Sequence, residues 1–194
     1  MKVTFERIVG PEYMTPVMRV TQGKDMYTPK MPKIETWYTM LLSEHSSDRC
    51  VTYRIFIEDI PYYAHVHLVR HHIGVQYHVY SQRDDNGIAS VTSRDDVKQG
   101  NLINMCMDVN AQALITIARK RLCHKSHRVC QDFVKKLKCA LIYDGDKYDQ
   151  VLGELLMPAC AWWRGYCAEP TPCGRVANVT KLVDIHRKAL DDKD

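Results

Sequence analysis

The residue types best suited to chemistry are concentrated in one stretch, LVRHHIGVQYHVYSQR, which runs from Leu68 to Arg83. Its charged and hydrogen-bonding side chains include Arg70, His71, His72, Ser81, Gln82 and Arg83. A guanidinium presents a planar fork of donors that matches an oxyanion, while imidazole and hydroxyl groups can bond to a polar ring. We therefore expect this stretch to bind a ligand that carries both a phosphate and a polar heterocycle.

The length and composition indicate one globular domain over residues 1–194. Of the 194 residues 45% are hydrophobic and 26% are charged, which is enough apolar material for a single core. No run of eighteen apolar residues offers a membrane span, and the first residues lack the apolar segment of a secretory signal. We expect a cytoplasmic protein with no membrane partner.

The charge and the cysteines narrow the class of ligand. A net charge of +4 suits phosphorylated small molecules, and it is mild for a nucleic-acid surface. Aromatic residues are not interleaved with basic ones in the way that single-strand binding requires. Eight cysteines without an export signal indicate reduced thiols or a metal site and argue against a disulfide framework.

Alternating hydrophobicity predicts a strand over residues 50–60. Val51, Tyr53, Ile55 and Ile57 fall on one face of this strand, and more polar residues fall on the other. Pro61 suits the first turn of a helix, so a helix over about residues 61–72 should follow. That helix would present the start of the Arg- and His-rich stretch near its C-terminal end.

The remaining elements are predicted from periodicity and from the position of breakers. We expect a short strand over 1–10, irregular loop over 10–33, a helix over 34–44 and a polar loop or lid over 84–103. Further helices are expected over 105–122, from there towards 141, over 148–157 and in the tail 179–194. A cysteine-containing C-terminal extension begins at about residue 158.

The spacing within the Arg- and His-rich stretch resembles the signature of the flavin-dependent thymidylate synthases, the ThyX family. That signature reads Arg-His-Arg, then seven or eight residues, then Ser, and usually x-Arg-Tyr. Arg70, His71, Ser81 and Arg83 match it, whereas His72 replaces the second Arg and the residue after Arg83 is Asp.

A second match lies in the helix predicted over 105–122, where Asn110 and Arg121 fall at the positions of a family Asn and of an essential Arg. Eleven residues are almost three helical turns, so the two side chains should share one face, roughly 16 Å apart. Gln112 stands where the family usually has Arg, and Thr116 stands where Asn is frequent. A Glu-His pair, Glu44-His45, precedes the strand as it often does in the family, and the resemblance covers about residues 35–135.

The resemblance implies an α+β fold, with a twisted sheet flanked by long helices, in a homo-oligomer, expected to be a tetramer. It also implies the reductive methylation of dUMP to dTMP, in which methylene-tetrahydrofolate supplies the carbon and FAD, reduced by NADPH, supplies the hydride. The FAD-binding residues would be Arg70, His71, His72, Asn110, Gln112 and Thr116. The nucleotide-binding residues would be His67, Arg70, Ser81, Gln82, Arg83 and Arg121, with Arg94 as a candidate for the phosphate.

Arg121 is the candidate catalytic residue. By this match its guanidinium would lie against the N3/O4 edge of the uracil ring and stabilise the ionised ring. No protein nucleophile is required, and Ser81 is expected to be a hydrogen-bond donor because no Ser-His-Asp arrangement is visible.

Several alternatives stay open at this point. The substrate could be UMP or a phage pyrimidine nucleotide, or the protein could bind a nucleotide without turnover. Asn110 could simply face solvent, and Arg121 could form a surface salt bridge. A metal site could form from His65, His67, His71, His72 and His78, or from Cys160, Cys167 and Cys173 with Cys130, His124 or His127.

Overall fold

The computed structural model describes residues 1–25, 28–80, 98–175 and 180–181. Its centre is a four-stranded sheet in the order β1-β2-β4-β3, in which every pair of neighbours is antiparallel. The strands are β1 (Lys2–Val9), β2 (Thr52–Pro61), β3 (Val75–Val79) and β4 (Leu102–Asn110). With helices against this sheet, the fold is α+β as predicted.

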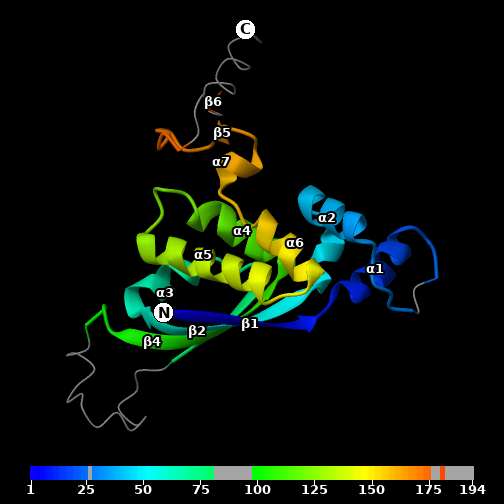
Figure 1. The fold of residues 1–194 in the computed structure, drawn as a ribbon, viewed down its shortest axis with the longest axis horizontal. Helices are drawn as coiled ribbons and strands as arrows, with labels where there is room; N and C mark the ends of the chain where they lie inside the picture. Colours follow the sequence, from blue (N-terminus) through cyan, green and yellow to red (C-terminus); the bar gives the residue numbers. More distant parts are fainter. Residues whose placement is uncertain (26–27, 81–97, 176–179, 182–194) are drawn as a thin grey trace.

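Helices cover one side of the sheet (Figure 1). These are α3 (Tyr62–Leu68), α4 (Ala111–Arg121), α5 (Arg128–Tyr143) and α6 (Lys147–Leu155). At one end of the sheet lie η1 (Pro11–Tyr13), α1 (Met14–Thr21), α2 (Ile34–Ser43) and η2 (Ser46–Cys50). Beyond α4 lie α7 (Ala159–Trp162) and the two short strands β5 (Tyr166–Cys167) and β6 (Thr180–Lys181). Within the described residues, none of the helices has the length and apolar character that a membrane span needs.

The alternation predicted for β2 is confirmed. Tyr53 and Ile55 are fully buried and Ile57 is only 1% exposed, whereas Phe56 on the other face is 41% exposed. The buried face of the sheet packs against the helices, and this one-sided burial is what produces a repeat of two residues.

The predicted helix over 105–122 is partly wrong, because its first residues belong to β4. Ile103, Met105, Met107 and Val109 are all buried and alternate with more exposed residues, which is strand periodicity. The helix α4 starts only at Ala111, where Asn110 Oδ1 accepts a hydrogen bond from the backbone N–H of Ala113 at 2.8 Å. Asn110 is therefore a capping residue and does not lie in a helix interior.

Other boundaries also differ from the prediction. The loop expected over 10–33 contains α1, which tolerates Pro16 because a first-turn N–H has no partner in the helix. Helix α3 ends at Leu68, so Arg70 to His72 lie in the connection to β3. Helices α4 and α5 are separate, and His127 caps α5 by accepting from Val129 N. The predicted tail helix over 179–194 and most of the loop over 84–103 lie outside the described residues.

A partly buried ionic network joins the sheet to α6. Arg7 on β1 donates to Asp149 Oδ1 at 2.7 Å and to Asp146 Oδ2 at 2.7 Å, and the Tyr53 hydroxyl donates to Asp149 Oδ1 at 3.0 Å. The hydrogen bond from Arg7 lowers the pKa of Asp146 to about 2. Asp146 also caps α6 through the backbone N–H groups of Tyr148 and Asp149. These bonds therefore fix the positions of β1, β2 and α6 relative to one another.

Replacing Arg7 with Ala should reduce the free energy of unfolding by about 3 kcal/mol, because Asp149, whose side chain is 7% exposed, would lose its cation. Denaturant unfolding followed by circular dichroism measures this loss. The control is Lys2→Ala, which removes an exposed ion pair with Glu58 and should cost less than about 1 kcal/mol. Equal losses in the two variants would contradict the assignment.

Candidate functional site

A cavity of about 470 Å³ lies between η2, the connection that follows α3, and the first half of α4. Its lining consists of Arg49, Arg70, His71, His72, Ile73, Gly74, Asn110, Gln112, Ala113 and Thr116. All six residues that the sequence assigned to a cofactor are in this lining. Segments 40 residues apart along the chain therefore meet at one place, which we call the η2–α4 cleft.

Gly74 and Asn110 fix one end of this cleft. The backbone N–H of Asn110 donates to the carbonyl oxygen of Gly74 at 3.0 Å. Gly74 has a φ of +73°, and a Cβ atom there would lie 2.4 Å from Asn110 Nδ2. Because the Oδ1 atom of Asn110 caps α4, its amide group has little freedom to move away. Only glycine fits this approach without strain.

Arg121 fixes the other end. Its Nε donates to His71 Nε2 at 2.9 Å, and its Nη2 donates to the carbonyl oxygen of His67. Burial, together with the charge of Arg121, lowers the pKa of His71 to about 4. The His71 ring is therefore neutral at neutral pH, accepts at Nε2 and carries its proton on Nδ1. Arg121 is absent from the residues that line the cleft, and it bonds directly to the lining residue His71.

Tyr77 on β3 supports the same connection, and sequence reasoning did not identify it. Its hydroxyl donates to the carbonyl oxygen of Leu68 at 2.6 Å and lies 3.1 Å from that of His71. Burial raises the pKa of Tyr77, so the hydroxyl stays protonated as a donor. Nothing in the spacing of the sequence separates this tyrosine from its neighbours Gln76 and His78.

Arg49 is a second residue that sequence reasoning missed. It belongs to η2, it is exposed, and its Nε donates to Gln112 Oε1 at 2.6 Å. Thr116 in turn donates to the backbone carbonyl oxygen of Gln112 at 3.0 Å. The cleft therefore contains a guanidinium beside position 112, although residue 112 itself is uncharged.

The other predicted site residues have different outcomes. Ser81, Gln82, Arg83 and Arg94 lie outside the described residues. The ring of His67 stacks on His127 at 5.8 Å, away from the cleft lining.

Glu44, from the Glu-His pair, accepts from Arg119 at 2.6 and 2.9 Å, and these bonds lower the pKa of Glu44. Arg119 also lies over the Trp162 ring at 5.0 Å. Glu44 therefore holds α2 to α4 and α7, and it is absent from the cleft lining.

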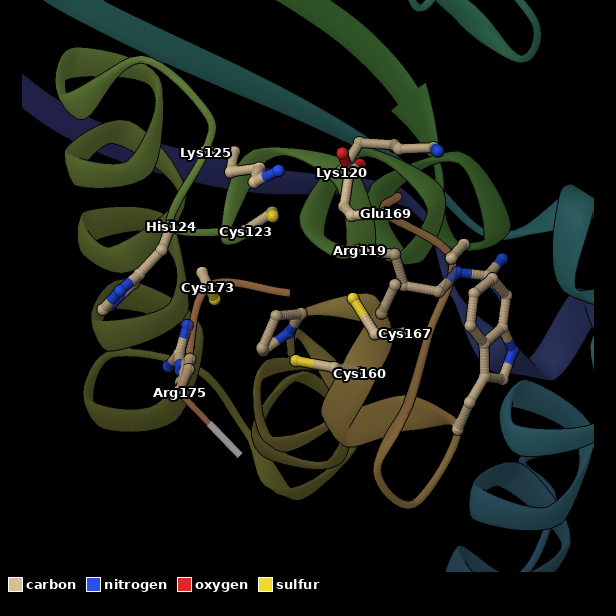
Figure 2. A pocket seen from close by; sticks show the side chains of 14 residues that line it. Arg119, Lys120, Cys123, His124, Lys125, Cys160, Cys167, Glu169, Cys173 and Arg175 are labelled. Carbon is tan, nitrogen blue, oxygen red and sulfur yellow. The ribbon is translucent and has the colours of Figure 1, made fainter. Parts of the chain in front are cut away.

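A second, smaller cavity of about 50 Å³ separates α4 from the C-terminal extension, and Cys160, Cys167 and Cys173 lie around it together with Cys123 and His124 (Figure 2). Within the part of the chain that the structure describes, no three His, Cys, Asp or Glu side chains are arranged to hold a metal ion. Among the described residues, the alternatives with a metal site therefore gain no support from the geometry, either at these cysteines or among the histidines.

No model of a protein family matches the sequence, and no curated protein sequence matches it. Solved structures do match the fold. The flavin-dependent thymidylate synthase ThyX from Helicobacter pylori, complexed with FAD and dUMP, aligns with a TM-score of 0.62 at 16% identity. The alignment covers 81% of this chain and 100% of that chain. A UMP/dUMP methylase, PolB from Streptomyces cacaoi, bound with 5-Br dUMP, aligns with a TM-score of 0.57 at 12% identity over 79% of this chain and 95% of that chain. The chain shares the fold of these enzymes.

Replacing Gly74 with Ala should reduce the free energy of unfolding by about 2–3 kcal/mol, because the new methyl group combines a strained φ with displacement of a helix cap. Gly23→Ala is the matched control, since Gly23 has a φ of +65° but nothing within 4 Å of the added Cβ. That variant should lose only about 1 kcal/mol in the same denaturant titration. A Gly74 variant as stable as the Gly23 variant would refute the close approach.

The stability of the protein should depend on His71 in acid. Between pH 6.5 and about pH 4 the unfolded chain binds a proton at His71 that the folded chain does not, so stability falls as the pH is lowered through this window. We expect the free energy of unfolding to fall by on the order of 1 kcal/mol, after a discount for the half-exposed ring.

Denaturant titrations at pH 4.5 and pH 7.5 measure the effect. Compared with the wild type, His71→Gln should lose about 1 kcal/mol less stability between pH 7.5 and pH 4.5, whereas His45→Gln, at an exposed position, should behave as the wild type does. A His71 variant with the same pH dependence as the wild type would contradict the assignment.

Proposed function

We propose that this protein is a flavin-dependent thymidylate synthase, which converts dUMP to dTMP with methylene-tetrahydrofolate, FAD and NADPH. One observation carries the proposal. The residues matched to the family's cofactor set converge on one cavity, in a fold shared with an enzyme crystallised with FAD and dUMP. Residues 1–194 would act as one domain, with an extension from about residue 158.

The chemistry of the cleft lining fits FAD. Arg49 and Arg70 bring two permanent positive charges, and the described lining contains no carboxylate. These guanidiniums would bind the diphosphate oxygens. The amide groups of Asn110 and Gln112 and the rings of His71 and His72 would bond to the polar edges of the ligand. When bound, the flavin supplies the hydride that completes the methyl group.

Arg121 is the proposed catalytic residue. Its Nε and Nη2 are used by His71 and His67, while its Nη1 has no hydrogen-bond partner among the described residues. A guanidinium fixed at two atoms and free at a third is preorganised to stabilise negative charge that develops on the uracil ring. Because His71 is neutral, its Nε2 can accept a hydrogen bond from Arg121, and its ring adds no second positive charge that would attract the developing anion. His67, Ser81, Gln82 and Arg83 remain the proposed nucleotide-binding residues beside Arg70 and Arg121.

We further propose a homo-oligomer, a tetramer, in which a neighbouring copy completes the cleft. In a single chain the cleft is open at the exposed side chains of Arg49, Arg70 and His72. FAD and a nucleotide together are larger than a cavity of about 470 Å³ can enclose. A second surface would have to cover the remainder of the ligands.

A related substrate is the second candidate. The structural similarity to a UMP/dUMP methylase favours UMP as an alternative to dUMP, with the same C5 methylation. The two differ at the 2′ position, and a single hydrogen bond to a hydroxyl can decide between them. Parallel assays with UMP and dUMP separate these candidates.

Arg121→Ala should lower turnover by about 100-fold or more, as expected for the loss of one preorganised donor of charge stabilisation. The assay is dTMP formation, followed together with NADPH oxidation that depends on both dUMP and methylene-tetrahydrofolate. Arg128→Ala, at an exposed position on α5, is the control and should keep full activity. An active Arg121 variant would exclude the catalytic role, and a wild-type protein without nucleotide-dependent turnover would exclude the proposed enzyme.

A further inference from the structure

Arg49 occupies an unusual position for a surface arginine. It follows Asp48 directly in η2, but the two side chains do not form an ion pair within the described residues. Asp48 is fully buried and neither of its carboxylate oxygens has a hydrogen-bond partner there. Arg49 lines the η2–α4 cleft. Burial raises the pKa of Asp48 and the positive charge of Arg49 opposes that rise, but the guanidinium forms no hydrogen bond with that carboxylate.

The orientation of Arg49 is fixed by a single neutral partner. Its Nε donates to Gln112 Oε1 at 2.6 Å, and Gln112 projects from the first turn of α4. Among the described residues, neither Nη atom of Arg49 has a partner, so the two outer donors of the guanidinium fork remain available. A guanidinium that is held at Nε and open at Nη1 and Nη2 can accept an oxyanion in bidentate geometry.

Apart from Arg49, the described lining of the cleft carries one permanent positive charge. Arg70 is the only other permanent cation in the described lining, while His71 is a neutral acceptor and Gln112 carries no charge. A ligand with a diphosphate would therefore meet two guanidiniums, one from η2 and one from the connection after α3.

Resting on the proposed function, we infer that Arg49 is a ligand-binding residue of this cleft, held by Gln112 and aimed at a phosphate of the bound dinucleotide. A single arginine at position 112 on α4 could bind such a phosphate by itself. Here Arg49 on η2 provides the guanidinium, and Gln112 on α4 holds it in place. In this protein the charge comes from η2, and α4 supplies the acceptor that positions it. The charge is therefore attached to the segment that precedes β2.

The test is FAD binding, measured by flavin fluorescence on the full chain. Arg49→Gln should weaken FAD binding by about tenfold at 50 mM salt, and this difference should shrink at 500 mM salt because salt screens an exposed charge–phosphate contact. Arg19→Gln, at an exposed position on α1, is the matched control and should bind FAD as the wild type does. Circular dichroism should show the same folded content in all three proteins.

A charge-relocation variant keeps the inference falsifiable if Arg49→Gln disturbs the structure. Arg49→Gln combined with Gln112→Arg exchanges the two partners and returns a guanidinium to the cleft, so it should recover most of the lost affinity.

The possible outcomes separate the two proposals. A wild type that binds FAD while Arg49→Gln binds equally well overturns the role of Arg49 and leaves the proposed function standing. A loss that is independent of salt, or that the exchanged pair does not recover, assigns Arg49 a structural role and also overturns the inference. A wild type that binds no FAD overturns both.

Discussion

The cleft depends on the contact between α4 and the connection that runs from α3 to β3. Asn110, at the start of α4, bonds to Gly74, and Arg121, at the end of α4, bonds to His71 and to the carbonyl oxygen of His67. The same helix therefore holds both ends of a short, exposed piece of backbone. A loop of this kind would otherwise lose considerable conformational entropy on binding a ligand, and the two anchors reduce that loss in advance.

The anchors work because the elements behind them are rigid. The half-buried Arg7, together with the buried Asp149 and Tyr53, joins β1, β2 and α6, and Glu44 joins α2 to Arg119 on α4. Strand β2 pairs with β4, which leads directly into Asn110 and α4. The backbone of Ala111 also donates to the carbonyl oxygen of Val51, just before β2. The cleft residues thus lie on α4 and its cap, on η2 and on a connection that is anchored at both ends, and these segments adjoin paired strands.

The charge of the titratable groups in and near the cleft depends on burial as well as on residue type, because burial shifts their pKa values. His71 lies beside Arg121 in a partly buried place, so it stays neutral and acts as an acceptor. Burial and the neighbouring charge of Glu44 raise the pKa of Asp48 to about 7, which reduces the negative charge within η2 near neutral pH. The positive charges of Arg49 and Arg70 are then the dominant permanent charges of the lining. An anionic ligand therefore meets a cleft whose histidine is neutral and whose nearest carboxyl group is buried.

The sequence alone determined the elements whose periodicity is strong and the residue types that bind anions. The alternation of Tyr53, Ile55 and Ile57 predicted β2. The family resemblance, which rests on the spacing from Arg70 to Ser81 and on Asn110 and Arg121, implied the fold and most of the residues that line the cleft. Only the tertiary structure decided that Asn110 caps a helix, that Arg121 bonds to His71, and that Arg49 lines the cleft. The last two facts depend on contacts between residues 50 or more positions apart, Arg121 with His71 and Arg49 with Gln112, whereas the Asn110 cap depends on β4 ending where α4 begins. Local periodicity carries no information about which distant side chains will meet, because sheet register and helix packing set those distances.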